Sequence, residues 1–366
     1  SCVITCSYEA RAFGVKTGMK FSEAKLMCPP LIRKASNPKK YALVSSHIME
    51  ILNDISPDIE IFSVDEAFID ISHCAKIYNS PIEVACLIKD KIFENVSLPC
   101  SIGISSNKSM AKFAAKLKKP DGITLIEPSK SHLFLDNCLV TELCGVSKGI
   151  QKFLNKHNVF FCKDMKRIPI SILGNQYGNI GRKIWLMAQG LDYDMLKLDN
   201  KPPKSFGHGK VTIPGLKDKY LVKKVFRHMC EKVAKRMRIN KFESNKFLIG
   251  YKTWNGWNMK KFHLHRFTNN GFDIYRLAEN LIDEVDFKIG INQVQVTAIN
   301  PKPVNLQTDI FASTEISHKH QIDSAVDKIN LKYLDTTIGP ARLLGEASSP
   351  DVISPSWRPK GWKRSV

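Results

Sequence analysis

Apolar residues along this chain follow two different periods, and the changes between them predict an order of helices and strands. Residues 41–55 repeat apolar side chains at helical spacing and stop before Pro57, which predicts an amphipathic helix. From Ile59 to Ile71 the period falls to two, with apolar side chains on both phases. That pattern predicts a buried strand, or two strands joined by a tight turn.

The segments that follow continue this alternation. Residues 82–93 and 107–118 have helical periodicity, whereas residues 100–104 and 123–126 have the length and composition of short strands. Strands that alternate with helices are typical of an α/β layer. The expected fold class is therefore α/β, built from several domains.

Residues 130–200 predict a separate, compact helical module in which glycines mark the ends of helices. The Lys-Pro-Pro sequence at 201–203 predicts a linker. Residues 206–300 then combine a basic helix at 221–238 with strand-like runs, which predicts a second α/β module. Beyond Pro303 the chain becomes polar, and we expect a flexible basic tail there.

The excess of basic over acidic residues indicates a class of binding partner. The 366 residues contain 55 Lys and Arg against 35 Asp and Glu, which gives a formal charge of +20 and a pI near 9.5. Such an excess is expected of a protein that binds polyphosphate. Composition alone leaves open a generally basic, solvated surface or a surface attracted to anionic lipid.

Cysteine and leader patterns indicate the compartment. Ten cysteines are scattered without a Cys-x-x-Cys pair, so neither a zinc site nor a disulfide framework is predicted. No run approaches the roughly 18 apolar residues that span a bilayer, and no charged-then-apolar leader opens the chain. We expect a reduced, cytoplasmic protein without a membrane partner. Because Ser1 begins directly in an apolar, strand-like stretch, we also expect a segment upstream of it.

Two adjacent carboxylates, Asp65 and Glu66, lie within the apolar stretch from Phe62 to Phe68. Burial of an unpaired charge there would cost several kcal/mol. A divalent metal such as Mg²⁺, held by one or two carboxylates and substrate phosphates, would meet that cost and would suit phosphoryl transfer. The alternative is a solvent-facing Glu66 beside a capped Asp65, since neighbours in a regular strand point to opposite faces.

The expected helix at 107–118 has an apolar stripe and a row of lysines on another face. The apolar residues are Met110, Phe113, Ala114 and Leu117, and the lysines are Lys108, Lys112, Lys116 and Lys119. Such a row is ordinarily a solvated face. Lys119 differs because it precedes Pro120, where a fixed backbone could direct its ammonium into a site.

Three segments resemble, in order and spacing, the central motifs of the Y-family (impB/mucB/samB-type) DNA polymerases. They are Tyr8-Glu9-Ala10-Arg11-x-Phe13-Gly14-Val15-Lys16-x-Gly18-Met19, Ser63-Val64-Asp65-Glu66-Ala67-Phe68-Ile69-Asp70-Ile71-Ser72, and Gly103-Ile104-Ser105-x-Asn107-Lys108-x-x-Ala111-Lys112 with its continuation Lys119-Pro120-Asp121-Gly122-Ile123. The resemblance implies a right-hand polymerase with an α/β palm, small fingers, an all-α thumb containing a helix-hairpin-helix, and an α/β little finger. The implied ranges are 1–36 for the fingers, 37–126 for the palm, 127–203 for the thumb, 204–303 for the little finger and 304–366 for a C-terminal tail.

The resemblance also implies roles for single residues. Asp65 matches the family's metal-binding aspartate, and Glu66 matches the catalytic glutamate that helps to hold the metal at the primer terminus. The positions that match contacts to the incoming deoxynucleoside triphosphate are Thr5, Tyr8, Arg11 and Lys119. Two Mg²⁺ ions are implied. The family's first motif, with a further metal-binding aspartate and an aromatic steric gate, would precede Ser1.

Contacts to primer-template DNA are implied in two regions. In the thumb they fall on Gly145 and Lys148, although Cys144-Gly145-Val146-Ser147 keeps only one glycine of the family's Gly-x-Gly turn. At the start of the little finger they fall on Lys204, His208 and Lys210, followed by the basic helix. His263 and His265 lack acidic or cysteine neighbours, so we interpret them as surface or phosphate-facing residues and not as metal ligands.

A short motif follows the expected little finger. Gln307-Thr308-Asp309-Ile310-Phe311 resembles the pentapeptide by which bacterial polymerases bind the sliding clamp, with Gln307, Ile310 and Phe311 as its anchors. The sequence Ala325-Val326-Asp327-Lys328-Ile329-Asn330 resembles the tail of the polymerase V catalytic subunit more than that of polymerase IV. A bacterial, damage-induced (SOS) setting is inferred.

The predicted activity is error-prone, DNA-directed DNA synthesis across damaged template. A different class of function stays open: a catalytically inactive relative that binds DNA and the clamp as a scaffold. A basic RNA-binding protein is less well supported, because no aromatic stacking motif is present.

Overall fold

The structure is a computed structural model, and it describes residues 2–74, 77–198, 202–304, 314–333 and 337–343. The chain divides into two compact units, Ser1–Tyr41 and Ala42–Val366. None of the helices in the described ranges is long and apolar enough to cross a membrane. All ten cysteines are free thiols.

The first unit contains two short helices, α1 (Tyr8–Ala12) and α2 (Phe21–Met27). The hydroxyl of Ser7 accepts a hydrogen bond from the Ala10 amide at 3.4 Å and so caps α1. Its small core contains Ala10, Val15, Ala24 and Cys28.

The second unit begins with helices that cover short strands. Helices α3 (Pro38–Ile55) and α4 (Pro81–Val96) form one core with the antiparallel strands β1 (Ile59–Ile61) and β2 (Ala67–Ile69). The sequence predicted both helices, and its alternative of two strands joined by a turn is confirmed at 59–71.

A β-α-β element follows. Strands β3 (Ile102–Ile104) and β4 (Ile123–Leu125) are parallel, and α5 (Lys108–Leu117) connects them. A Cβ on Gly103 would stand 2.0 Å from the Ala111 carbonyl oxygen, so only glycine lets β3 approach α5 this closely. The amide side chain of Asn107 caps α5 at the Met110 amide.

Residues 128–187 contain mostly helices, as predicted for 130–200, whereas residues 191–198 form neither helix nor strand. The helices are α6 (Ser131–Leu135), α7 (Lys148–Lys156) and α8 (Ile170–Met187) with three short 3-10 helices, η2 (Pro128–Lys130), η3 (Val140–Glu142) and η4 (Cys162–Arg167). Their core includes Leu154, Met165 and Leu173, and it also takes in Met110 and Phe113 of α5. Leu117, expected on the same apolar stripe, is instead 44% exposed. Helix α5 therefore links this module to the preceding strands.

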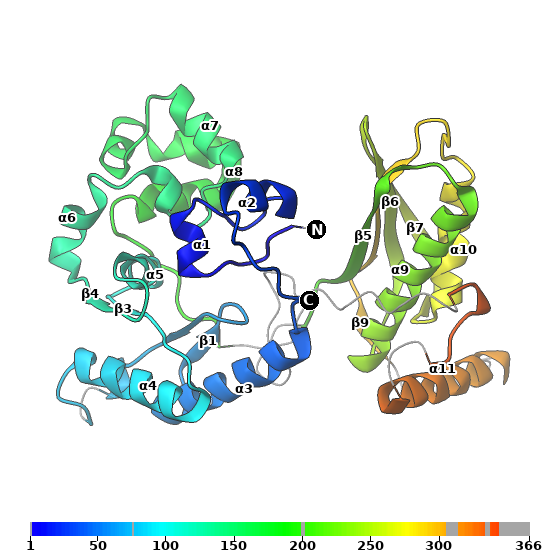
Figure 1. The fold of residues 1–366 in the computed structure, drawn as a ribbon, viewed down its shortest axis with the longest axis horizontal. Coiled ribbons are helices and arrows are strands. Elements are labelled where there is room, and N and C mark those ends of the chain that lie inside the picture. Colours follow the sequence, from blue (N-terminus) through cyan, green and yellow to red (C-terminus); the bar gives the residue numbers. More distant parts are fainter. Residues whose placement is uncertain (1, 75–76, 199–201, 305–313, 334–336, 344–366) are drawn as a thin grey trace. The chain divides into compact units, whose positions relative to one another are not determined.

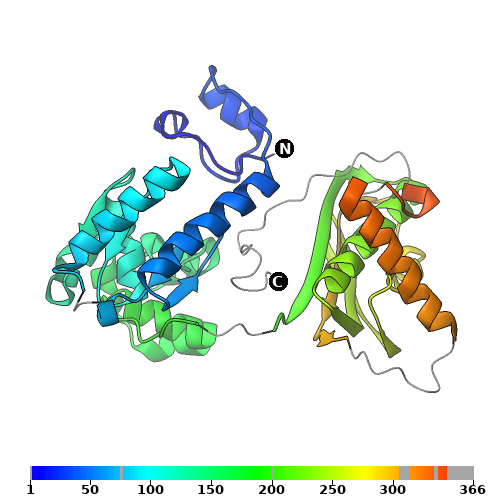
Figure 2. The ribbon, with the colours of Figure 1, turned by 90° about the horizontal axis from the view of Figure 1, so that it is seen from below.

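The last sheet is antiparallel and has the order β5-β8-β6-β7, with β9 on β6. Its strands are β5 (Ser205–Leu216), β6 (Phe242–Thr253), β7 (Gly256–Thr268), β8 (Ile291–Ile299) and β9 (Lys302–Pro303). Helices α9 (Lys219–Ile239) and α10 (Gly271–Ile282) cover one of its faces and share its core (Figure 1). The other face carries no helix among the described residues (Figure 2).

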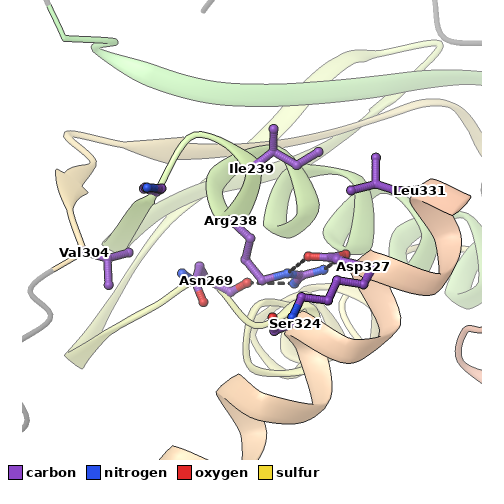
Figure 3. A pocket seen from close by; sticks show the side chains of 9 residues that line it. Arg238, Ile239, Asn269, Val304, Ser324, Asp327 and Leu331 are labelled. Carbon is purple, nitrogen blue, oxygen red and sulfur yellow. Dashed lines mark hydrogen bonds and ion pairs between the residues drawn. The ribbon is translucent and has the colours of Figure 1, made fainter.

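One helix was not expected from the sequence. Residues 314–333, within the range predicted as a tail, form α11 (Thr314–Tyr333), and a short 3-10 helix, η5 (Ala341–Leu343), follows. Arg238 at the end of α9 binds Asp327 of α11 through two hydrogen bonds of 2.6 and 2.9 Å (Figure 3). Both side chains are largely buried, so α11 belongs structurally to the sheet module.

Candidate active site and DNA-binding surface

Asp65 and Glu66 lie in the turn between β1 and β2. The amides of Phe62 and Ser63 both donate to the Glu66 carbonyl oxygen, at 2.9 and 3.0 Å, and close the turn. The buried hydroxyl of Ser45 on α3 donates to the carbonyl oxygen of Val64 and ties the turn to the helix. The two acids thus occupy successive positions of an anchored turn and not of a regular strand.

The two carboxylates have different partners. Asp65 is exposed, and its Oδ1 accepts a 2.6 Å hydrogen bond from the Ser63 hydroxyl. The side chain of Glu66 is 42% exposed, and its Oε2 lies 2.6 Å from the Lys112 Nζ. Both acids are therefore reachable from solvent, and the expected unpaired burial of charge does not occur.

The lysine row is only partly a solvated face, because Lys108 and Lys112 are half-buried and paired with acids whereas Lys116 and Lys119 are exposed. Lys108 donates to Glu60 and to the Met195 carbonyl, Lys112 donates to Glu66, and Lys116 donates to the Glu142 carbonyl. Sequence spacing gave the row but not its partners, because those partners come from strands and helices distant in sequence. Lys112 is a site residue that the sequence analysis left unassigned.

Lys119 lies beyond the end of α5, in the turn 118–121, and is exposed. Among the described residues no hydrogen bond or ion pair joins it to Asp65 or Glu66. Its proposed contact to a triphosphate therefore rests on the motif match alone.

The donor set can be tested for a divalent metal. No cluster of three or more His, Cys, Asp or Glu side chains suited to a metal occurs in the described part of the chain. Asp65 and Glu66 offer hard oxygen ligands at adjacent, accessible positions. Mg²⁺ commonly takes one or two carboxylates and fills its remaining positions with water and substrate phosphates. The pair fits such an ion, provided that substrate contributes ligands.

The three motif residues of the first unit lie close together in sequence around α1. Tyr8 and Arg11 are one turn apart on this helix, and the Arg11 guanidinium lies 5.0 Å from the Tyr8 ring centre. Thr5 precedes the helix and is exposed, as are Tyr8 and Arg11. A hydroxyl, a phenol and a guanidinium therefore face solvent from one small region.

Gly145 and Lys148 lie at the start of α7. Gly145 has a φ of +92°, which disfavours any residue with a Cβ, and a Cβ there would meet nothing within 4 Å. Lys148 is the first residue of α7 and is exposed. The Ser147 side chain does not cap the start of α7, and exposed Lys148 stands beside it.

The register of β5 separates the expected contact residues of the sheet module. His208 and Lys210 pair with Val296 and Val294, so they lie on the side of the sheet that faces the helices. Gly207 and Gly209 lie on the open face, opposite Thr297 and Gln295 of β8. Lys204 immediately precedes the strand and is exposed.

Exposed lysines on neighbouring strands share this open face, and the sequence analysis did not single them out. They are Lys246 and Lys252 of β6 and Lys261 of β7. Their common side follows from the register, because buried Phe247, Ile249 and Tyr251 occupy the alternate positions of β6. The open face therefore carries Gly207, Gly209, Thr297 and Gln295 on β5 and β8, and three exposed lysines on β6 and β7.

Comparisons with known proteins agree with this architecture. Residues 1–116 match the impB/mucB/samB family, and residues 203–309 match the impB/mucB/samB family C-terminal domain. DNA polymerase IV of Pelotomaculum thermopropionicum is 33% identical over 290 residues, which are 77% of this chain and 71% of the relative. DNA polymerase IV of Moorella thermoacetica is 29% identical over 92% of this chain and 85% of its own length.

A solved structure, the Y-family DNA polymerase chimera Dbh-Dpo4(243-245)-Dbh, superposes with a TM-score of 0.72 at 23% identity. The alignment covers 83% of this chain and 88% of that one. The fold is therefore that of a Y-family DNA polymerase, which confirms the predicted α/β class. With the sequence matches above, the chain belongs to the impB/mucB/samB family of Y-family DNA polymerases.

Proposed function

We propose that this protein is an error-prone translesion DNA polymerase, which adds deoxynucleotides to a primer 3′ end opposite damaged template. The observation that carries the proposal is the anchored Asp65–Glu66 turn, with both carboxylates accessible, in a chain with the Y-family fold. The similarity to relatives named DNA polymerase IV supports the same activity. Nothing in these comparisons favours the inactive scaffold.

The reaction is attack of the primer 3′-hydroxyl on the α-phosphate of a deoxynucleoside triphosphate, with pyrophosphate as the leaving group. Two Mg²⁺ ions would lower the pKa of the attacking hydroxyl and neutralise charge on the triphosphate. Asp65 and Glu66 would bind them from the turn, with Glu66 nearest the primer terminus. Thr5 and Tyr8 would donate hydrogen bonds to phosphate oxygens, and Arg11 and Lys119 would neutralise charge that spreads over them.

Primer-template DNA would lie against the open face of the β5-β8-β6-β7 sheet. The side chains of Thr297 and Gln295 lie over Gly207 and Gly209 of β5 on this face, and Lys246, Lys252 and Lys261 would supply cations for backbone phosphates. Exposed Lys204 would contribute at the edge of this face, and Gly145 and Lys148 would meet a phosphate at the start of α7. His208 and Lys210 lie on the helix-covered side of β5, so their proposed DNA contact is supported by the sequence resemblance alone. Such contacts position DNA without reading sequence, which suits synthesis on any template.

The finer setting is also part of the proposal. The clamp-binding residues Gln307, Ile310 and Phe311 lie outside the described residues, so their support is the sequence motif and its position after the last sheet. A bacterial cytoplasmic protein induced by DNA damage is consistent with the motif and with the bacterial relatives. Low fidelity is expected where discrimination depends mainly on base pairing itself.

Primer extension across an abasic template site tests the function. The protein expressed from its complete gene should extend the primer past the site with Mg²⁺, and Asp65→Ala should abolish extension. Glu127→Ala provides a control, since Glu127 is an exposed acid paired only locally with Lys130. Absence of extension by the wild-type protein, or extension by Asp65→Ala at the wild-type rate, would overturn the proposal.

A further inference from the structure

Lys112 holds one of the two proposed metal ligands. Its ammonium lies 2.6 Å from Oε2 of Glu66, and its side chain is only 18% exposed, against 42% for Glu66. A charged hydrogen bond of this length is among the stronger polar contacts in proteins. Lys112 is therefore the more buried partner of this ion pair, and Glu66 is the partner that solvent reaches.

Packing fixes the position of this ammonium. Helix α5 is pressed onto β3 at Gly103, where the absence of a side chain lets the two backbones meet. The Lys112 Nζ also lies 4.4 Å from the ring centre of Phe62, and Phe62 packs edge-on against Phe68. A cation held over an aromatic face beside a carboxylate has little freedom to move.

The other lysines of the row have different surroundings. Lys108 binds Glu60, which is 3% exposed and also accepts a hydrogen bond from the Lys197 amide. Lys116 binds only a backbone carbonyl among its described contacts. Of these three lysines, Lys112 is the one whose partner is an accessible acid in the proposed catalytic turn.

We propose that Lys112 is a positioning residue that orients the Glu66 carboxylate for metal and limits how tightly the turn binds it. This inference rests on the proposed polymerase function. The ammonium fixes the carboxylate through its contact with Oε2. It also offsets one of the two adjacent negative charges, so a bound cation meets a weaker local field.

Removal of the Lys112 charge should change the metal affinity and the nucleotide addition rate in opposite directions. In Lys112→Met the turn gains net negative charge, so Mn²⁺ should bind about three- to tenfold more tightly, as expected for loss of one nearby, partly screened charge. The untethered carboxylate should at the same time lower the nucleotide addition rate by about tenfold or more. If the substitution only disturbed the local structure, the Mn²⁺ affinity and the nucleotide addition rate would both fall.

The test uses the protein from its complete gene and titrates Mn²⁺ by electron paramagnetic resonance without DNA, beside single-turnover nucleotide addition. Lys112→Arg should restore both values toward wild type, whereas Lys112→Gln should behave like Lys112→Met. Lys116→Met is the matched control, because it removes the same charge from the same helix without freeing an acid. Thermal unfolding verifies that each variant is folded.

Unchanged Mn²⁺ affinity in both neutral variants, or weaker affinity together with a lower rate, would overturn the inference. The polymerase proposal can fail separately: if the wild-type protein adds no nucleotide, that function is wrong, and the DNA-free Mn²⁺ titration still tests Lys112.

Discussion

Acidic side chains in this protein have different surroundings. The surroundings distinguish buried acids that stabilise the fold from accessible acids that could bind a ligand. Glu60 is buried and paired with Lys108. Asp164 is buried and accepts hydrogen bonds from the amides of Phe161 and Phe160 at 2.9 and 3.2 Å. Asp65 and Glu66 remain accessible at a turn, where a ligand can reach them. Only the last pair is placed to exchange partners during a reaction.

The contribution of Asp164 to stability should depend on pH. The Phe161 amide lowers the pKa of Asp164 below its ordinary value of 3.8, with further help from Phe160 and Arg167. Its stabilising effect is therefore complete above pH 3.8 and disappears as the pH falls through the lower folded pKa. Asp164→Ala should reduce the free energy of unfolding at pH 7 by about 1–2 kcal/mol.

Urea unfolding at pH 7 and at pH 3 measures this effect. The difference between wild type and Asp164→Ala should shrink at the lower pH, while Asp90→Ala, at an exposed position of α4, should cost little at either. An equal difference at both pH values would show that the carboxylate charge is not the cause.

A helix or strand could be predicted from the sequence where its own residues carried a clear apolar periodicity or a capping residue. Helix α5 was predictable, because Asn107 is a strong cap and buried residues recur at helical spacing behind it. Strands β5 and β7 were missed. Gly207, Gly209 and Pro214 weaken the strand pattern of β5, and β7 carries charges on an exposed edge. Polar α11 was missed because its stability comes from docking and not from its own periodicity.

The same limit applies to the site. Asp65 and Glu66 were proposed as metal ligands from two acids within an apolar stretch and from the motif match, and the structure places them in an accessible turn and not in a buried strand. Lys112 was not assigned, because its contact with Glu66 joins residues 46 positions apart and depends on how α5 meets the β1–β2 turn. Periodicity shows which face of a helix is polar, but it does not show which acidic residue of another element contacts that face.

Docking of α11 depends on Arg238, whose side chain is 12% exposed. Asp327→Ala should leave that guanidinium with the Asn269 carbonyl and the more distant Asp323. We expect the free energy of unfolding to fall by about 2 kcal/mol in Asp327→Ala, which is less than for loss of a fully buried ion pair. Hydrogen exchange should become faster across α11. Lys328→Ala, at the adjacent exposed position, should leave exchange unchanged, and protection of α11 in Asp327→Ala equal to wild type would contradict the docking account.

Charge acts over the molecule as a whole. With a formal charge of +20, DNA affinity should fall steeply with salt, since each neutralised phosphate releases counterions. Changing Lys246, Lys252 and Lys261 together to Ala should reduce the slope of log affinity against log salt by about 2–3.

The matched control changes three exposed lysines outside the sheet, Lys288, Lys328 and Lys332. It alters net charge equally and should leave the slope nearly unchanged. Equal slopes in the two triple variants would show that the open face of the sheet does not carry the DNA.

We propose that different parts of this chain carry DNA binding and chemistry, with the chemistry at the β1–β2 turn. Rapid-quench measurement of one nucleotide addition by Glu66→Gln, alongside DNA affinity from fluorescence anisotropy, tests it most directly. The addition rate of Glu66→Gln should be at least about 100-fold lower than that of the wild type, and its DNA affinity should be unchanged. A variant that adds nucleotide at the wild-type rate would contradict this proposal.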